Sequence, residues 1–264
     1  MNKITKKTSE EIERLRIAGG HLANILDELS DMARPGVSTA SLDTRARELA
    51  SQYDCEPILL GYKPSFADRP YPAAICVSVN DCVQHGIPTE EQVLIEGDVV
   101  NIDMSIRHSG MVVDSGRTVG VGTLSADDRK LIAVTEEALA HGIKQAKPGN
   151  RIGDISAAIG NFVTKKELSV VEVLCGHGVG YDVHEPPNIL NFGRPNTGPK
   201  IEVGHVYAIE PIVNLGSKEV YFDDDGDGYS VYTSDGSRSA HFEHTVAITD
   251  SGPEIMTRRS KKVK

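Results

Sequence analysis

Apolar residues near the start of the chain recur at the three-to-four-residue spacing of a helix buried on one face. Leu15, Leu22 and Leu26 belong to this stripe, and the sequence TSEE at residues 8–11 is typical of a capping box at a helix start. Pro-Gly pairs, which end helices, follow the first and third helical segments. The chain is therefore predicted to form four helices, at residues 9–33, 38–53, 126–147 and 152–166.

Runs of β-branched and other apolar residues follow each pair of predicted helices and indicate strands. Residues 99–106 and 111–119 are two such runs, and the sequence RHSG between them is typical of a hairpin turn. Each half of the chain thus has two helices followed by mainly antiparallel strands, which is an α+β pattern rather than alternating βαβ units. Strands are also predicted at residues 73–79, 170–173, 206–213 and 242–248.

The second half of the chain repeats features of the first. Residues 97–103 (GDVVNID) recur as 204–210 (GHVYAIE), so that an apolar run ends in an acid both times, at Asp103 and at Glu210. A duplicated fold can close around a pseudo-twofold axis, which would bring the matching acids to one point. We therefore expect one catalytic domain, residues 1–264, whose halves at about 8–120 and 126–250 share a curved central sheet.

Composition and charge exclude several classes of protein. The chain has 264 residues, 39% of them hydrophobic, and no apolar run approaches the roughly 20 residues that span a bilayer. No secretory signal is visible at the N-terminus, and four cysteines without a CxxC pair do not predict disulfides. A net charge of -10 argues against a specific nucleic-acid surface. We expect a cytoplasmic monomer with no membrane partner, and a solvated basic tail at residues 251–264.

Acids lie within the apolar runs, where an unpaired carboxylate is costly. Asp103 and Asp114 are on the two arms of the predicted hairpin and, if the turn centres near residues 108–109, fall nearly opposite each other, about 5 Å apart. Two carboxylates that close repel each other unless a cation lies between them. A solvent-facing acidic pair is the alternative, but Glu210 and Glu243 lie in equally apolar runs.

Histidines complete a candidate metal site. His177 lies in CGHGVG at residues 175–180, where the glycines leave space around the imidazole. Neither an HExxH zinc motif nor a phosphate-loop Gly-Lys-Ser/Thr is present. Four carboxylates and one imidazole suit manganese, ferrous iron, cobalt or zinc, and two such metals about 3.5–4 Å apart can share a hydroxide that hydrolyses amides or phosphoesters. A metal-free structural network is the alternative.

The acidic segment DDDGDG at residues 223–228 resembles the start of a calcium loop. Its twelfth position is Ser234 rather than the Glu that calcium loops require, and no predicted helices flank it. We predict an acidic surface hairpin here rather than a cation site.

The motifs around the acids and histidines resemble those of the pita-bread metallopeptidases, and most closely those of type I methionine aminopeptidases. The resemblance covers residues 4–249. The 26 positions between His184 and Glu210 leave no room for the helical insertion of type II enzymes, and the extra N-terminal domain of prolidases and aminopeptidase P is absent. The motifs that carry the resemblance are HGIP at 85–88, NID at 101–103, GHGVG at 176–180, HEP at 184–186, IEP at 209–211 and FEHT at 242–245.

The resemblance implies a pita-bread fold and a methionyl aminopeptidase, which removes the N-terminal methionine of nascent proteins and peptides by a hydroxide that bridges two divalent metals. Asp103 would bind one metal, Asp114 and Glu243 would bridge both, and His177 and Glu210 would bind the other. The residues themselves leave the metal open among cobalt, manganese, iron and zinc.

Three residues are given catalytic roles by the same resemblance. Glu210 would carry the proton of the hydroxide, while His85 and His184 would contact the scissile amide and stabilise its tetrahedral intermediate. The free amine of the substrate would bind at a metal, which restricts cleavage to N-termini.

The resemblance also implies an apolar pocket for the methionine side chain, walled by Tyr71, Cys76, Val183 and Tyr229. Val183 stands where many relatives have Phe, and Tyr229 where a Trp often closes the pocket. Residues 63–70 add length to the neighbouring loop.

Two further expectations and two alternative functions remain. The resemblance suggests a monovalent cation near Asn80 and Ser239, and contact with the ribosome. An X-Pro aminopeptidase or dipeptidase of the same fold is one alternative. A non-catalytic peptide- or ribosome-binding module is the other, and the five intact ligand residues argue against it.

Overall fold

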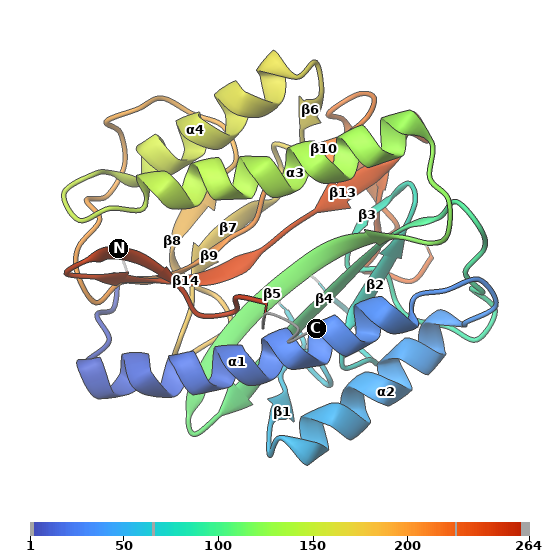
Figure 1. Ribbon diagram of the computed structural model, residues 1–264, viewed down its shortest axis with the longest axis horizontal. Coiled ribbons are helices and arrows are strands. Elements are labelled where there is room, and N and C mark those ends of the chain that lie inside the picture. Colours follow the sequence, from blue (N-terminus) through green and yellow to red (C-terminus); the bar gives the residue numbers. More distant parts are fainter. Residues whose placement is uncertain (1–2, 65–66, 225, 260–264) are drawn as a thin grey trace.

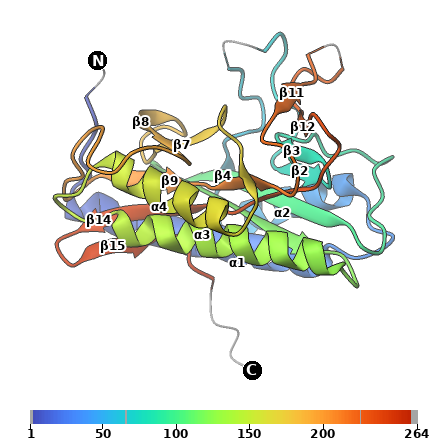
Figure 2. The same cartoon turned by 90° about the horizontal axis from the view of Figure 1, so that it is seen from above.

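The structure is a computed structural model that describes residues 3–64, 67–224 and 226–259 (Figure 1). Four long helices cover one face of a curved arrangement of strands, with α1 and α2 over the first half and α3 and α4 over the second (Figure 2). No helix of the described ranges is long and apolar enough to cross a membrane. The helices are α1 Ser9–Met32, α2 Thr39–Gln52, α3 Ala126–Gln145 and α4 Ile152–Lys165.

Local signals explain where the helices begin. The predicted capping box is present at α1, because the Thr8 side chain accepts the Glu11 N–H and the Glu11 carboxylate accepts the Thr8 N–H. Leu15, Leu22 and Leu26 on the apolar face of α1 are fully buried among the residues of β4 and β5. The prediction of four helices is confirmed, with ends within two residues of those expected.

β4 and β5 have ten residues each, and the other strands are shorter. Every ladder between strands in the described chain is antiparallel. They form four hydrogen-bonded groups, of which β1, β2, β4 and β5 make up the largest group of the first half and β15-β14-β9-β7-β8 that of the second. The strand bounds are β1 Glu56–Pro57, β2 Cys76–Val79, β3 Cys82–Gln84, β4 Val99–His108, β5 Met111–Gly120, β6 Ser169–Val170, β7 Cys175–Gly178, β8 Glu185–Leu190, β9 Val206–Ile209, β10 Ile212–Asn214, β11 Val220–Phe222, β12 Val231–Thr233, β13 Ser239–His241, β14 His244–Thr249 and β15 Gly252–Ile255.

The two halves meet along β5 and β14, which lie side by side in Figure 1. The Glu243 N–H donates to the Gly116 carbonyl at 2.8 Å, and the Asp114 N–H donates to the Thr245 hydroxyl at 2.8 Å. These bonds draw acids from both halves to one seam. The α+β pita-bread class predicted from the sequence is thus confirmed in its elements and its antiparallel pairing.

Several predicted strands differ from the observed ones. The run 206–213 is two strands, β9 and β10, which belong to different sheets and are separated by Glu210 and Pro211. The run 242–248 begins only at residue 244, and the expected strands at 73–79 and 170–173 are shorter than predicted. Apolar composition does not reveal these breaks, although Pro211 has no N–H to continue a ladder. The breaks aim Glu210 and Glu243 into the space between the sheets.

The β4–β5 turn is centred one residue later than expected. Ser109 and Gly110 both have positive φ, 49° and 77°, as in a two-residue type I′ turn. Asp103 is therefore opposite Gly116, and Asp114 is opposite Ser105. The two acids, expected to lie nearly opposite each other with a turn centred near residues 108–109, are displaced by two residues in the ladder. They are diagonal neighbours on one face, within reach of a shared ligand.

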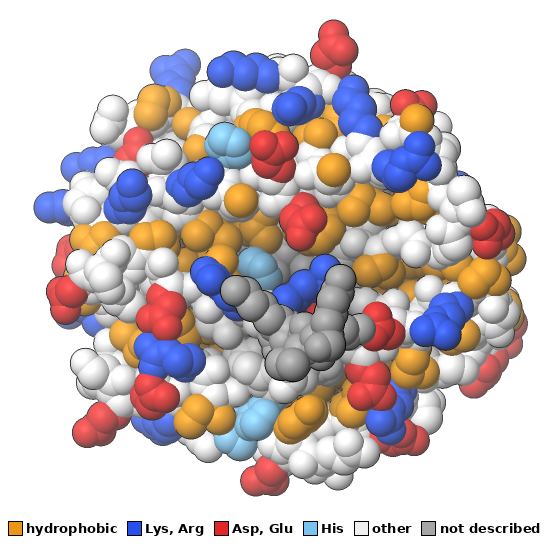
Figure 3. Space-filling model, viewed as in Figure 1, with side chains coloured by type: hydrophobic (Ala, Val, Ile, Leu, Met, Phe, Trp, Pro, Cys, Tyr) orange, Lys and Arg blue, Asp and Glu red, His pale blue; other side chains and the backbone are white. Residues whose placement is uncertain are grey.

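The C-terminal and acidic segments complete the fold. Residues 252–255, which were assigned to the basic tail, form β15 against β14, and Met256 is buried in the core of the first half. The tail therefore begins later than residue 251, and residues 260–264 lie outside the described ranges. The predicted acidic hairpin is present as β11 and β12, although Asp225 is not described. On the helical face, acidic and basic side chains are interspersed (Figure 3).

Candidate metal centre and pocket

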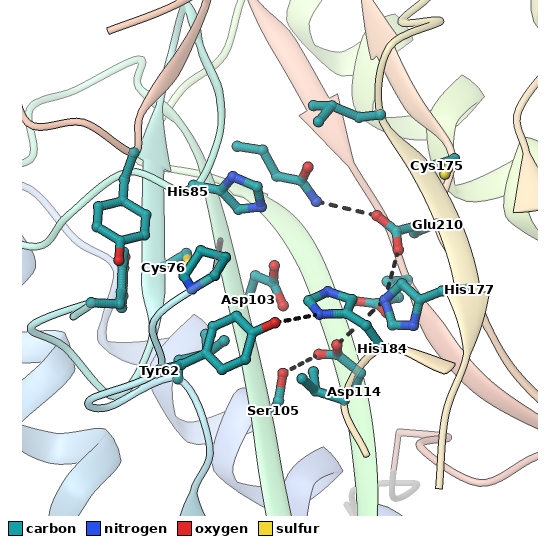
Figure 4. Close-up of a pocket in the computed structure, with 18 of the residues that line it drawn as sticks. Tyr62, Cys76, His85, Asp103, Ser105, Asp114, Cys175, His177, His184 and Glu210 are labelled. Carbon is teal, nitrogen blue, oxygen red and sulfur yellow. Dashed lines mark hydrogen bonds and ion pairs between the residues drawn. The ribbon is translucent and has the colours of Figure 1, made fainter. Parts of the chain in front are cut away.

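A cavity of about 520 Å³ opens between the two halves. Its walls come from the β4–β5 hairpin on one side and from β7, β9 and the segment before β8 on the other (Figure 4). Asn80 and Ser239 of the expected monovalent-cation site do not line this cavity. It is lined by all the residues assigned from the sequence to the metals, to catalysis or to the apolar pocket: Tyr71, Cys76, His85, Asp103, Asp114, His177, Val183, His184, Glu210, Tyr229 and Glu243.

Four carboxylates lie at the base of the cavity and are almost fully buried. Asp103 and Asp114 come from β4 and β5, Glu210 from the break after β9, and Glu243 from the residues between β13 and β14. The Ser105 hydroxyl donates to Asp114 Oδ1 at 2.8 Å. None of the ion pairs of the described residues joins any of the four to a lysine or arginine. We refer to this group of four acids as the carboxylate centre.

His177 faces the carboxylate centre with one specific nitrogen. Its Nδ1 lies 3.0 Å from the Gly178 carbonyl, which can only accept, so Nδ1 carries the ring proton. Its Nε2 lies 3.4 Å from Glu210 Oε1 and 3.9 Å from Asp114 Oδ2. An imidazole whose other nitrogen bonds to a backbone carbonyl presents its lone pair as metal ligands do.

Unsatisfied buried atoms mark the same place. Asp103 Oδ1, Glu243 Oε1 and His241 Nε2 have no hydrogen-bond partner among the described residues. Asp114, His177 and Glu243 each offer a ligand atom, and these atoms lie within 4.8 Å of one another. Because buried polar atoms are ordinarily paired, this arrangement fits a bound cation.

The pKa values support that fit. Burial, followed by the charge of neighbouring acids, raises the pKa of Asp103, Glu210 and Glu243 well above the usual range. Burial also raises the pKa of Asp114, and it lowers the pKa of His177 to about 4. A divalent cation would favour the ionised acids and the neutral imidazole, which are the forms that bind metal. The donor set therefore fits divalent metals.

His85 and His184 lie in the cavity beside the carboxylate centre. Burial lowers the pKa of each to about 4, so both rings are neutral at pH 7. His184 Nδ1 lies 3.1 Å from the Tyr62 hydroxyl, and its ring packs edge-on against His177 with centroids 4.5 Å apart (Figure 4). His85 has a φ of 60°, a conformation that is rare outside glycine and is often found at functional sites.

The apolar end of the cavity is built from aromatic and thiol side chains. The rings of Tyr71 and Tyr229 meet edge-on at 5.0 Å, and the Tyr71 hydroxyl donates to the Gly86 carbonyl at 2.9 Å. Cys76 and Val183 are also buried. With their hydroxyls turned to backbone carbonyls, the tyrosines present carbon to the cavity, which suits an apolar ligand.

Two lining residues were missed by the sequence reasoning. Tyr62 contacts His184, and the Gln84 amide donates to Glu210 Oε2 at 3.2 Å. Gln84 directly precedes His85 and follows Val83. A polar residue next to a candidate catalytic histidine could have been recognised as a site residue from the sequence. Tyr62 offered no comparable signal, because its contact spans 122 residues of sequence.

Comparisons with known proteins agree with this geometry. The sequence pattern of metallopeptidase family M24 matches residues 13–250. The methionine aminopeptidase of Aquifex aeolicus is 43% identical over 254 residues, which cover 95% of this chain and 97% of that protein. Methionine aminopeptidase 1 of Bacillus subtilis is 43% identical over 252 residues, with 96% and 98% covered.

Solved structures show the same relationship. The crystal structure of methionine aminopeptidase from Thermotoga maritima has a TM-score of 0.92 at 39% identity, and the match covers 97% of this chain and 100% of that one. A prolidase from Pyrococcus furiosus has a TM-score of 0.73 at 19% identity over 97% of this chain and 66% of that one. The second likeness extends to the fold alone.

Proposed function

We infer that the chain removes the N-terminal methionine from nascent proteins and peptides, on the premise that it belongs to the methionine aminopeptidases of metallopeptidase family M24. One observation carries the inference. A buried group of carboxylates without a lysine or arginine partner lies in the same cavity as an apolar pocket lined by Tyr71 and Cys76. The first part fits metal-assisted amide hydrolysis, and the second fits an unbranched apolar side chain.

We propose that the carboxylate centre and His177 hold two divalent metals. Asp103 would bind one, His177 and Glu210 the other, and Asp114 and Glu243 both. The unpartnered oxygens of Asp103 and Glu243 support this assignment. When bound, the metals supply a nucleophile at neutral pH and polarise the scissile carbonyl. Oxygen-rich donors suit cobalt, manganese, iron or zinc.

Glu210 is the proposed proton carrier. Its carboxylate accepts a hydrogen bond from Gln84, and burial raises its pKa. A carboxylate with a raised pKa can take a proton from the attacking nucleophile and return it to the amide nitrogen as that nitrogen leaves. The Gln84 amide would hold the carboxylate in one orientation during both steps.

His85 and His184 are the proposed contacts to the scissile amide. If the Tyr62 O–H donates to His184 Nδ1, the ring proton of the neutral imidazole lies on Nε2 and is available to a carbonyl oxygen. A neutral donor stabilises the developing oxyanion. The low pKa of both rings supports this role, because each keeps a single, defined proton at pH 7.

The methionine side chain is proposed to bind among Tyr71, Cys76, Val183 and Tyr229. A flexible thioether packs well against aromatic and thiol surfaces. The free amine of the substrate would then lie at the carboxylate end of the cavity, which restricts cleavage to chain ends.

Other expectations stay proposals. A monovalent cation beside Asn80 and Ser239 is supported by the proximity of the two residues, since the Ser239 N–H donates to the Asn80 carbonyl at 2.9 Å. We also propose that the protein acts in the cytoplasm on nascent chains at the ribosome, because the proposed substrate arises there. We propose further that it acts as a monomer.

The test is turnover of Met-Ala-Ser and Ala-Pro peptides by metal-free protein to which each metal is added back. We expect methionine release with at least one of cobalt, manganese, iron or zinc. Cleavage of Ala-Pro alone would instead support the X-Pro alternative. Metal binding without cleavage of either peptide would favour a binding module.

A further inference from the structure

A buried ion pair lies at the edge of the cavity and involves the N-terminal segment. Residues 3–6, which precede α1, line a surface groove together with Tyr181 and residues of the segment 199–205. Figure 2 shows the N-terminal segment, residues 3–8, leading into α1. Lys7 Nζ lies 2.7 Å from Glu185 Oε2, and only 1% and 7% of the two side chains are exposed. The Lys7 N–H also donates to the Gly204 carbonyl at 2.7 Å, which anchors the segment to the second half of the fold.

Glu185 uses its other oxygen to close a loop. Glu185 Oε1 accepts the N–H groups of Tyr181 and Asp182, at 2.6 and 3.3 Å. Between these contacts lie Val183, in the wall of the apolar pocket, and His184, beside the carboxylate centre. One carboxylate therefore connects the N-terminal segment to the loop that carries two proposed substrate contacts.

Lys7 also packs directly on the backbone of this loop. Gly180 has a φ of 135°, and a Cβ atom there would lie 2.3 Å from Lys7 Cε. Lys7 Nζ lies 4.7 Å from the centre of the Tyr181 ring. The Thr5 hydroxyl donates to Glu185 Oε2 as well. The N-terminal segment therefore contacts both ends of the loop, at Gly180 and at Glu185.

We propose that Lys7 and Glu185 are positioning residues, whose ion pair holds residues 180–186 so that Val183 keeps its place in the pocket wall and His184 reaches the scissile amide. The proposal rests on the proposed function for the roles of Val183 and His184. Lys7 does not line the cavity, so it acts on the reaction only through Glu185 and the loop. Displacement of a substrate contact by about 1 Å can lower turnover about 10²-fold.

A purely structural role makes a different prediction. If the ion pair only stabilised the fold, its loss would lower the amount of active enzyme, and all substrates would lose activity equally. If the pair positions the loop, the ratio of kcat/KM for methionine to that for norleucine changes, because Val183 no longer holds one position. That ratio does not depend on the fraction of enzyme that is folded.

The experiment compares metal-loaded wild type, Lys7→Met and Arg117→Met on Met-Ala-Ser and its norleucine analogue. Arg117 forms a buried ion pair with Asp27 on the helical side of β5 and is the matched control. We expect Lys7→Met to lower kcat for methionine by about 10- to 100-fold and to bring the ratio towards one, with unchanged metal stoichiometry. Arg117→Met should leave the ratio unchanged. A folded Lys7→Met protein with the wild-type ratio would overturn the proposal.

Hydrogen exchange provides a readout that does not need activity. In Lys7→Met the amides of Tyr181 and Asp182 should exchange faster than in wild type, whereas Arg117→Met should not alter them. The double variant Lys7→Met/Glu185→Gln should recover part of the protection and of kcat, since the Gln carbonyl can accept the same two N–H groups without a buried unpaired charge. Unchanged exchange in Lys7→Met would overturn the proposal.

Two outcomes separate this proposal from the proposed function. If wild type cleaves no methionine peptide but Lys7→Met still frees the two amides, the function is wrong and the structural link stands. If Lys7→Met does not fold, Thr5→Val removes only one hydroxyl bond to Glu185 and should change the exchange and the ratio in the same direction by a smaller amount. No change in either quantity for Thr5→Val would then contradict the link.

Discussion

The carboxylate centre and Glu185 both place buried acids in the wall of the same cavity, but they differ in the partners of those acids. Glu185 has Lys7, Thr5 and two backbone N–H groups as partners. Burial alone would raise its pKa, but hydrogen bonds from Lys7, Thr5 and Tyr181 together hold that pKa below its usual value. Within the carboxylate centre only Asp114 and Glu210 receive side-chain hydrogen bonds, and the pKa values are raised.

Similar burial therefore accompanies pKa shifts of opposite direction, and the partners decide that direction. The ionised form of Glu185 is favoured, and both of its oxygens have hydrogen-bond partners within the protein. In the carboxylate centre, burial and the charge of neighbouring acids disfavour the ionised forms, and a bound cation would offset that repulsion. This difference distinguishes an acid with partners inside the protein from the acids proposed to bind metal, although both line the same cavity.

The largest expected effect comes from changing one acid of the carboxylate centre. Glu210→Gln should keep the fold and lower kcat by at least about 10²–10⁴-fold, because a proton carrier and a metal ligand are lost together. Steady-state turnover of Met-Ala-Ser, with circular dichroism as the fold control, measures this. Glu254→Gln, which alters only an exposed ion pair with Arg16, is the matched control. Activity of Glu210→Gln within a few-fold of wild type would contradict both roles.

A change in the loop held by Glu185 should affect turnover without affecting the metals. His184→Ala removes a donor to the developing oxyanion, and such donors contribute about 10²–10³-fold to kcat. Metal content measured by plasma mass spectrometry should stay at the wild-type value. A lower metal content would instead indicate that His184 is a metal ligand and belongs with the carboxylate centre.

Removal of the metals should make the stability of the protein depend on pH, because the acids of the carboxylate centre, unlike Glu185, have raised pKa values. The carboxyls of the carboxylate centre have folded pKa values above the unfolded values near 4. The folded metal-free protein therefore binds more protons than the unfolded chain and loses stability as pH rises. Buried histidines with a pKa of about 4, such as His177 and His184, act in the opposite direction between about pH 4 and 6.5.

The loss should therefore appear above about pH 6.5. We expect the Tm of metal-free protein to fall as the pH rises above this value, by about 2–4 °C for each kcal/mol lost, and the Tm of metal-loaded protein to change less. Thermal melts with chelator or with metal measure this. A metal-free Tm that rises with pH above about 6.5 would contradict the raised pKa values of these acids.

The smallest expected effect concerns the pocket wall. Val183→Phe should fill space beside Tyr71 and Tyr229 and increase the preference for methionine over norleucine and leucine. Misfit of about one methylene changes discrimination by about 1–3 kcal/mol, so wild type should cleave the norleucine peptide measurably. Ratios of kcat/KM for the three peptides measure this. Loss of methionine activity with improved leucine cleavage in Val183→Phe would show that Val183 does not line the pocket as proposed.

Local features of the sequence determined much of this protein. The capping box at Thr8, the Pro-Gly pairs and the apolar spacing act over a few residues, and the four helices follow from them. The duplicated acids at Asp103 and Glu210 and the motifs around them were sufficient to predict that all the proposed site residues share one cavity.

Only the tertiary structure decided the rest. The register that makes Asp103 and Asp114 diagonal, the sheet change at Glu210, and the pairing of residues 252–255 with β14 that buries Met256 depend on which distant strands pair. The bond between Lys7 and Glu185 spans 178 residues. Such contacts leave no periodic signal along the chain, because each depends on the packing of whole elements and not on the residues beside it.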